Sequence, residues 1–318
     1  MKLGNMLITQ NNGSGSRVMD CSTMPGTPNP SPDSFLELCF ESYFQTAALN
    51  TPFIVVDDGS TDDSLEIIQR YASRITRIIA KKKNTGLVRG MNEAAEVLVS
   101  QYGCDALCRF DADIEFLTPG WDIRFVRYFE NNPRVAAVGG LQLLPFGAVW
   151  ALGDMLIHPE GYTHIFNWHN ATKAIEDKPP PLMLSGDLAL GNIECDSVMG
   201  CLAAFRASAY AEIGGQRAEF DGLRGETEDL NLRLLLAGLQ CVALGGVPFI
   251  HRHWEYQKKT ASYDAPEQVY RSLTQWKKLW GWDKIHPDLN DIYQKWQGTP
   301  LVRNLLKTGA GEVIYIGP

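Results

Sequence analysis

The sequence of 318 residues lacks an uninterrupted apolar run long enough to span a membrane. Its most apolar window, residues 135–153, contains Gln142, Pro145 and four glycines, which favours a buried strand followed by a loop. Residues 1–9 lack the long apolar core and the cleavage site of a signal peptide. We therefore expect no transmembrane segment, with peripheral membrane contact through the apolar window as the alternative.

Paired cysteines are also missing. The seven cysteines are odd in number and include no Cys-x-x-Cys pair, which argues against a disulfide framework and against a zinc site. Buried, reduced thiols are the better interpretation. Since free thiols are typical of a reducing compartment, we expect a cytoplasmic protein.

The chain as a whole has no excess of positive charge. It carries 29 Lys and Arg against 37 Asp and Glu, a net charge of −8, which excludes a chain-wide basic surface for nucleic acid. Residues 252–308 differ, because they have a net charge of +4 and hold five of the eight tryptophans. We expect a main domain of residues 1–254 and a basic, Trp-rich helical extension of residues 255–318.

Short apolar runs alternate with amphipathic segments along the main domain. The runs predict strands at residues 52–56, 75–80, 106–110, 135–144, 195–205 and 241–250. For the first strand two candidates stay open, residues 6–9 and residues 17–21. The alternation predicts an α/β fold, a mostly parallel sheet flanked by helices, in which ligands bind at the carboxyl ends of the strands.

Acidic residues follow two of these strands. Asp57 and Asp58 come after residues 52–56 and could accept hydrogen bonds from a base imide or from ribose hydroxyls; the alternative is a turn that leads to a helix cap. Asp111 and Asp113 come after residues 106–110. Side chains two residues apart on extended backbone share a side, so these carboxylates could converge on Mg²⁺ or Mn²⁺. The alternative is a polar loop.

Three further segments contain candidate site residues. Gly86 and Arg89 open an expected helix, where an anionic group could bind, or where the arginine is simply solvated. His251 follows the last strand and is either a metal or phosphate contact or a structural histidine. Trp276 and Trp280 share a face of a helix in the extension, which predicts burial, with an acceptor platform as the alternative.

The remaining segment is an acidic helix start that contains Glu226, Glu228 and Asp229. Acids at this position gain from the helix dipole, and one of them could also serve as a general base. Arg233 lies four residues after Asp229 on the same helix face and could orient its carboxylate. Glu228 points about 100° away, toward an acceptor or the helix cap.

In this order and spacing, the motifs resemble those of the family-2 glycosyltransferases with the GT-A fold. The resemblance covers about residues 35–255. It is carried by Asp57-Asp58-Gly59-Ser60, Asn84-x-Gly86 with Asn92, Asp111-Ala112-Asp113, Gly214-Gly215, Glu228-Asp229-Leu230 with Arg233, and His251. The chain departs from the family pattern in the irregular residues 6–30 and in the three residues that follow Gly215.

The resemblance implies a metal-assisted direct displacement. A sugar would move from a UDP- or dTDP-type nucleotide diphosphate sugar to an acceptor hydroxyl, with inversion at the anomeric carbon and a divalent cation, Mn²⁺ or Mg²⁺. A glycan or a lipid-linked acceptor is the first expectation. The alternatives are a hydroxylated nucleic-acid base as acceptor, suggested by the basic, Trp-rich extension, and a catalytically inactive carbohydrate-binding relative.

The resemblance also implies roles for individual residues. The residues expected to contact the donor nucleotide are Asp57, Asp58, Gly86, Arg89 and Asp111. The residues expected at the metal are Asp111, Asp113 and His251. Asp229 is the expected general base, with Glu228 beside it at the catalytic helix start.

Overall fold

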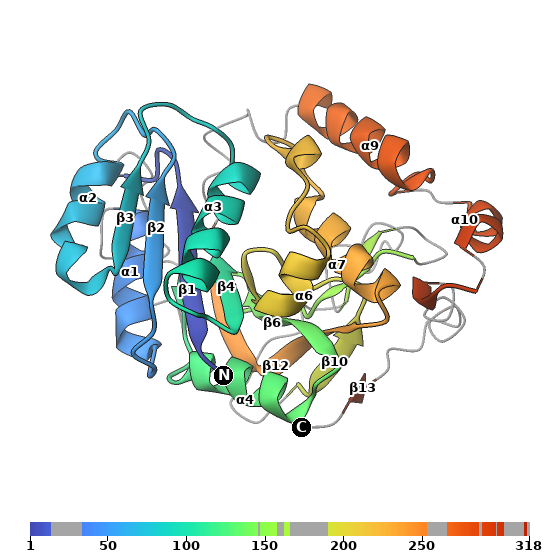
Figure 1. The fold of residues 1–318 in the computed structure, drawn as a ribbon, viewed down its shortest axis with the longest axis horizontal. Coiled ribbons are helices and arrows are strands. Elements are labelled where there is room, and N and C mark those ends of the chain that lie inside the picture. The colour runs from blue at the N-terminus through green and yellow to red at the C-terminus, as the bar shows by residue number, and fades with distance from the viewer. Residues whose placement is uncertain are drawn as a thin grey trace.

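One large sheet runs through the part of the chain that the structure describes. This computed structural model describes residues 1–13, 34–145, 147–157, 162–165, 190–252, 266–285, 288–296, 298–301 and 315–316. The strands of the main path follow the spatial order β13-β10-β12-β6-β11-β4-β1-β2-β3, while β5 pairs with β12 and β7 pairs with β6 (Figure 1). Two short strands, β8 and β9, form a separate pair.

The strand bounds, in chain order, are β1 Leu3–Thr9, β2 Phe53–Asp57, β3 Arg77–Ala80, β4 Ala106–Phe110, β5 Ile114–Phe116, β6 Val135–Leu143, β7 Val149–Ala151, β8 Asp154–Met155, β9 Thr163–His164, β10 Asn192–Cys195, β11 Leu202–Arg206, β12 Gln240–His251 and β13 Tyr315–Ile316. Seven of the nine strands on the main path point the same way, and β10 and β11 oppose them. The prediction of an α/β fold on a mostly parallel sheet is confirmed.

Helices cover both faces of this sheet (Figure 1). The helix bounds are α1 Phe35–Thr46, α2 Ser64–Arg70, α3 Leu87–Ser100, α4 Trp121–Asn131, α6 Ala207–Glu212, α7 Glu226–Leu236, α9 Pro266–Trp280 and α10 Leu289–Trp296, with 3₁₀ turns η1 Ala72–Arg74 and η2 Ala218–Phe220. The apolar side chains of α1, α2 and α4 join one core cluster, and those of α3, α7 and α9 join the other.

Alternation along the strands explains these two cores. In β1, Met6 and Ile8 belong to the cluster under α3, while Leu3 and Leu7 belong to the cluster under α1. Successive side chains of a strand point to opposite faces, so a sheet that is covered on both sides needs apolar residues at nearly every position. The sequence supplies this, and of the two candidates for the first strand the structure forms the earlier one; residues 17–21 lie outside the described part.

The prediction of one strand over residues 195–205 is wrong. β10 ends at Cys195, and β11 begins only at Leu202. Between them the chain turns, and Gly200 lies against α7: a Cβ there would be 2.4 Å from Thr227 Oγ1. The segment was predicted as a strand because its residues are apolar, but apolar residues can also pack into the core from a turn.

The C-terminal extension packs into the same core as the sheet. Trp276, Trp280 and Trp282 are 1–3% exposed and belong to the cluster that contains α3 and α7. The rings of Trp276 and Trp280 stack with their centroids 5.8 Å apart. Burial of this helix face is therefore confirmed, and these two rings have no open face on which an acceptor could stack.

Asp196 is a buried carboxylate just after β10. Its Oδ2 accepts hydrogen bonds from the backbone N–H groups of Leu156, at 2.8 Å, and Ile157, at 3.1 Å. Burial raises the pKa of Asp196 to about 6, and the nearby Asp154 adds to the shift, although the two hydrogen bonds oppose it. The folded chain thus keeps a proton there that the unfolded chain releases near pH 4.

The free energy of unfolding should therefore fall as pH rises through 6, since the folded state binds this proton more tightly than the unfolded state. The loss from this one group is about 1–1.5 kcal/mol between pH 5 and pH 7.5. Urea unfolding at a series of pH values checks it. Asp196→Asn, which keeps an acceptor for both N–H groups, should remove that part of the decline; parallel curves for the two proteins would contradict the assignment.

Candidate active site

A short antiparallel pairing assembles the predicted metal ligands. β4 ends at Phe110, and the Asp111-Ala112-Asp113 turn leads into β5, whose Ile114 pairs with His251 at the end of β12. His251 Nε2 lies 3.1 Å from Asp113 Oδ1 and 3.8 Å from Asp111 Oδ2. One ligand atom from each of these residues lies within 4.8 Å of the others. As predicted, they form a group that could hold a divalent cation.

Neighbouring side chains fix the orientation of His251. Its Nδ1 lies 3.3 Å from the amide nitrogen of the buried Gln142. Burial lowers the pKa of His251, but the Asp113 carboxylate and Cys201 outweigh burial and hold the pKa well above its usual range. The carboxylate oxygens and the imidazole are suitable ligands for Mn²⁺ or Mg²⁺, and a bound cation would take the place of the proton between His251 and Asp113.

Arg109 lies directly beside this group. It projects from β4 two residues before Asp111, and its side chain is 2% exposed. Its Nη2 is 3.1 Å from Asp111 Oδ1, and its Nη1 is 3.2 Å from Glu226 Oε1 and 3.0 Å from Thr227 Oγ1. We call Asp111, Asp113 and His251 the metal group. The guanidinium of Arg109 therefore joins the metal group to the start of α7.

The two aspartates after β2 have different environments. Asp57 is buried, and its Oδ1 has no hydrogen-bond partner among the described residues. Asp58 is equally buried, but it accepts hydrogen bonds from Thr85 N, Thr85 Oγ1 and Gly86 N at 2.8–3.1 Å. An unsatisfied buried carboxylate oxygen is costly, and of the two aspartates Asp57 is the one with an acceptor oxygen left unused among the described residues. Asp58 holds the loop that precedes α3.

An internal carboxylate occupies the start of α3. Asp221 Oδ1 accepts a hydrogen bond from Val88 N at 2.9 Å, and its Oδ2 pairs with Arg89 Nε at 3.2 Å. Gly86 allows this approach: its φ is +103°, and a Cβ there would be 2.2 Å from the Asp221 carboxylate. Gly86 and Arg89 thus lie against the Asp221 carboxylate in this structure, and their contact with the donor nucleotide stays a prediction.

The predicted base, Asp229, is fully buried. Its Oδ1 accepts from Arg217 at 3.0 Å and from Trp280 Nε1 at 3.1 Å, and its Oδ2 accepts from Arg233 Nε at 2.9 Å. The expected pairing with Arg233 is present. Burial raises the pKa of Asp229, although both arginines oppose that shift. These contacts tie α7 to the extension.

The other two acids at the start of α7 have their own partners. Glu228 Oε1 is 2.5 Å from Lys284 Nζ, a residue of the extension. Glu226 turns toward Arg109 and is thereby linked to Asp111. Of the three acids, Glu226 is the one that the structure connects to the metal group, whereas the sequence resemblance places the base at Asp229.

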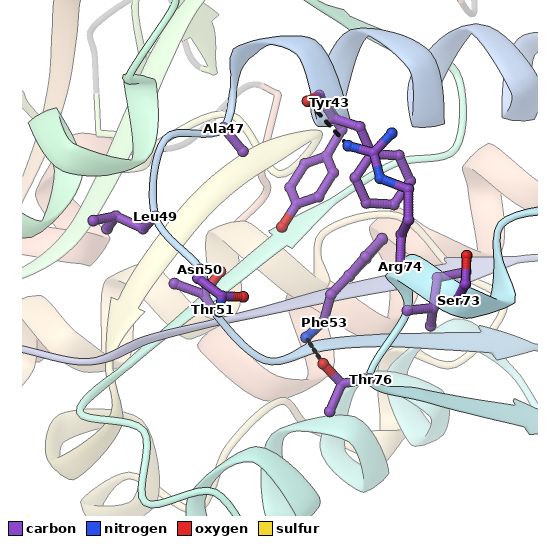
Figure 2. A pocket seen from close by; sticks show the side chains of 11 residues that line it. Tyr43, Ala47, Leu49, Asn50, Thr51, Phe53, Ser73, Arg74 and Thr76 are labelled. Carbon is purple, nitrogen blue, oxygen red and sulfur yellow. Dashed lines mark hydrogen bonds between the residues drawn. The ribbon is translucent and has the colours of Figure 1, made fainter.

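Sequence reasoning missed Arg109, Asp221 and Lys284 as partners of the site. Arg109 had a signal, because it is the one charged residue in an otherwise apolar strand, Ala106–Phe110. The other two had none, since they reach the site from distant segments. A hollow of about 390 Å³ was also not predicted; it opens at the start of β2, near Tyr43 and Arg74, away from the carboxyl ends of the strands (Figure 2).

Comparison with known proteins agrees with the family resemblance of the motifs. Residues 33–148 match the family model "Glycosyl transferase family 2". The match lies within the segment whose motifs resemble this family, and that resemblance is confirmed over these residues. No curated protein sequence matches the chain.

Solved structures support the GT-A-type fold. GalNAc-T7 with UDP, GalNAc and Mn²⁺ superposes with a TM-score of 0.52 at 14% identity, over 79% of this chain and 44% of that one. Mannosyltransferase PcManGT from Pyrobaculum calidifontis, with GDP-Man and Mn²⁺, gives 0.51 at 14% identity over 98% and 79%. S. aureus TarS 1-349 with UDP-GlcNAc gives 0.55 at 10% identity over 98% and 74%. The chain spans less than half of the GalNAc-T7 structure.

Helices capable of crossing a bilayer were also sought among the described residues. None of them combines the necessary length with a sufficiently apolar composition.

Proposed function

We propose that this chain, through its family-2 glycosyltransferase domain, transfers a sugar from a UDP- or dTDP-type nucleotide diphosphate sugar to a hydroxyl of a glycan or lipid-linked acceptor. Transfer proceeds with inversion at the anomeric carbon. The group of Asp111, Asp113 and His251 holds a divalent cation, Mn²⁺ or Mg²⁺. We place the activity in the cytoplasm, a location supported by the six described cysteines, which are all buried free thiols.

The observation that carries this proposal is that two carboxylates, Asp57 and Asp111, lie at the carboxyl ends of strands in the same sheet. Asp57 ends β2 with an unpartnered buried oxygen, and Asp111 follows β4 within the metal group. β1 lies between β2 and β4, so the two carboxylates are about two strand spacings, ~10 Å, apart. A nucleoside held at Asp57 thus places its diphosphate toward Asp111, Asp113 and His251.

The chemistry of Asp57 supports the donor class. A carboxylate can only accept hydrogen bonds, so Asp57 would bind a part of the ligand that carries an N–H or an O–H group. The imide N–H of uracil or thymine is such a donor. Because Asp58 already accepts from Thr85 and Gly86, its part in donor binding is to hold the loop that borders the nucleoside.

The residues of the metal group have a simple task in the reaction. A divalent cation bound there supplies positive charge to the departing nucleotide diphosphate. Asp113 and His251 present their ligand atoms 3.1 Å apart, and Asp111 presents Oδ2 while Arg109 holds Oδ1. The ligands are therefore oriented before the donor arrives, which lowers the cost of organising the site.

A carboxylate must accept the proton of the acceptor hydroxyl, and the start of α7 provides three candidates. The family resemblance favours Asp229, with Glu228 beside it, and both stay proposals. The contacts support a third assignment, Glu226, because Asp229 is enclosed by Arg217, Arg233 and Trp280. Glu226 is 13% exposed and is joined to Asp111 through one guanidinium.

The metal role predicts that Asp113→Asn abolishes most sugar transfer without unfolding the chain, since Asp113 lies in a turn at the sheet edge. The measurement is turnover with saturating Mn²⁺, alongside the thermal unfolding midpoint. Glu96→Gln, which removes an exposed charge from α3, is the control and should behave as wild type. Undiminished activity of wild type in excess chelator would refute the role of the cation.

The donor role predicts that Asp57→Ala weakens binding of UDP or dTDP by roughly 5- to 150-fold, the equivalent of losing one buried polar partner. Isothermal titration of the nucleotide checks this. Asp58→Ala should weaken binding too, but together with a lower unfolding midpoint, because it releases the loop at Thr85 and Gly86. An unchanged dissociation constant in Asp57→Ala would rule out the contact.

Three variants identify the base. Glu226→Gln should lower turnover by about 10²–10⁴-fold with nucleotide affinity retained. Asp229→Asn should instead lower the free energy of unfolding by about 3–5 kcal/mol, because two arginines lose their buried partner. If Asp229→Asn stays folded and loses turnover while Glu226→Gln and Glu228→Gln stay active, the base is Asp229, as the resemblance implies.

A further inference from the structure

A positive charge is built into the centre of the sheet beside the metal group. Arg109 is the fourth residue of β4, which lies between β1 and β11, and its other residues are apolar. Burial opposes the charge on Arg109, but Asp111 and Glu226 outweigh burial and hold its pKa above the usual range. The guanidinium is thus a permanent cation that cannot leave the site.

The contacts of Arg109 divide the oxygens of Asp111 between two cations. Oδ1 pairs with Arg109 Nη2 at 3.1 Å, and Oδ2 faces His251 Nε2 at 3.8 Å. The other arm of the guanidinium pairs with Glu226 at 3.2 Å. A divalent cation held by Oδ2 therefore sits one carboxylate away from a fixed positive charge.

We propose that Arg109 is the internal counter-cation of the metal group, and that it keeps Mn²⁺ binding weak until the donor diphosphate is present. The proposal rests on the metal role given under the proposed function. The carboxylates of Asp111, Asp113 and Glu226 surround the site, and Arg109 cancels one of their charges. In a partly buried site, where the effective dielectric constant is low, this repulsion of a divalent cation is substantial.

This arrangement has a consequence for the catalytic cycle. Arg109 neutralises part of the negative charge of the carboxylates, and the diphosphate supplies negative charge in its place. The cation and the nucleotide therefore bind cooperatively. After release of the nucleotide diphosphate, the charge of Arg109 would again weaken cation binding by Asp111, Asp113 and His251. Mg²⁺ and Mn²⁺ sites that share their ligands with substrate phosphates have the same requirement.

The test is isothermal titration of Mn²⁺ alone into the nucleotide-free chain. Arg109→Met, which keeps an unbranched apolar stem but removes the charge, should bind Mn²⁺ at least about tenfold more tightly than wild type. Damage to the fold would weaken binding, so tightening separates the electrostatic role from a merely structural one. Arg109→Lys, which keeps the charge, should stay within about threefold of wild type, as should the control Glu96→Gln.

Glu226 supplies a second test of charge balance, and its first variant leaves Arg109 in place. Glu226→Gln alone leaves the guanidinium less neutralised and should weaken Mn²⁺ binding by about three- to tenfold. Adding Arg109→Met to it removes one charge of each sign, so the double variant should return to within about threefold of wild type. A coupling of this kind is what a double-mutant cycle measures.

Three results would overturn the proposal, and they distinguish failure of the counter-cation role from failure of the metal role. If wild type binds Mn²⁺ but folded Arg109→Met binds it equally or more weakly, the counter-cation role is wrong while the metal site stands. The same holds if the double variant binds as weakly as Glu226→Gln. If neither wild type nor any variant binds Mn²⁺, with or without UDP, the metal role itself fails.

Discussion

The site depends on one short antiparallel pairing, between β5 and the end of β12. Asp113 and His251 are 138 residues apart in the chain, and this pairing brings their ligand atoms to 3.1 Å. Arg252 reinforces it twice, because its N–H donates to Asp113 O at 2.9 Å and its side chain pairs with Glu115 Oε2. Without this register, the Asp-x-Asp turn after β4 would be two carboxylates on a surface loop. With it, the turn becomes part of a three-ligand group with a fixed orientation.

The start of α7 connects that group to the rest of the molecule. Its three acids lie within four residues, and helix geometry sends them in different directions: Glu226 to Arg109 under the metal group, Glu228 to Lys284, and Asp229 to Arg217, Arg233 and Trp280. One helix turn thus joins the edge of the sheet that holds Asp111, Asp113 and His251 to the Trp-rich extension. The extension is thereby part of the architecture of the site, since it encloses the carboxylate that the family resemblance assigns to catalysis.

Local patterns in the sequence predict much of the fold and part of the candidate site, whereas the other features depend on contacts between distant segments. The β/α alternation predicts the parallel strands, and the acidic turn after β4 predicts the pair Asp111 and Asp113, because both follow from neighbouring residues. The break between Cys195 and Leu202 was not predictable, since apolar turn residues fill a core as strand residues do. The contact of Asp221 with the start of α3 was not predictable either, nor was the different hydrogen bonding of Asp57 and Asp58. Both depend on contacts between segments that are distant in the sequence.

The central claim is that Asp111, Asp113 and His251 hold the cation that receives the diphosphate of a nucleotide sugar. The most direct test is a crystal structure of the chain grown with UDP and Mn²⁺, with anomalous diffraction recorded at the manganese edge. The account predicts one anomalous peak within coordination distance of Asp113 Oδ1 and His251 Nε2, in contact with the diphosphate, with the base of the nucleotide at Asp57. A diphosphate bound elsewhere, or an ordered nucleotide with no manganese at these three residues, would contradict it.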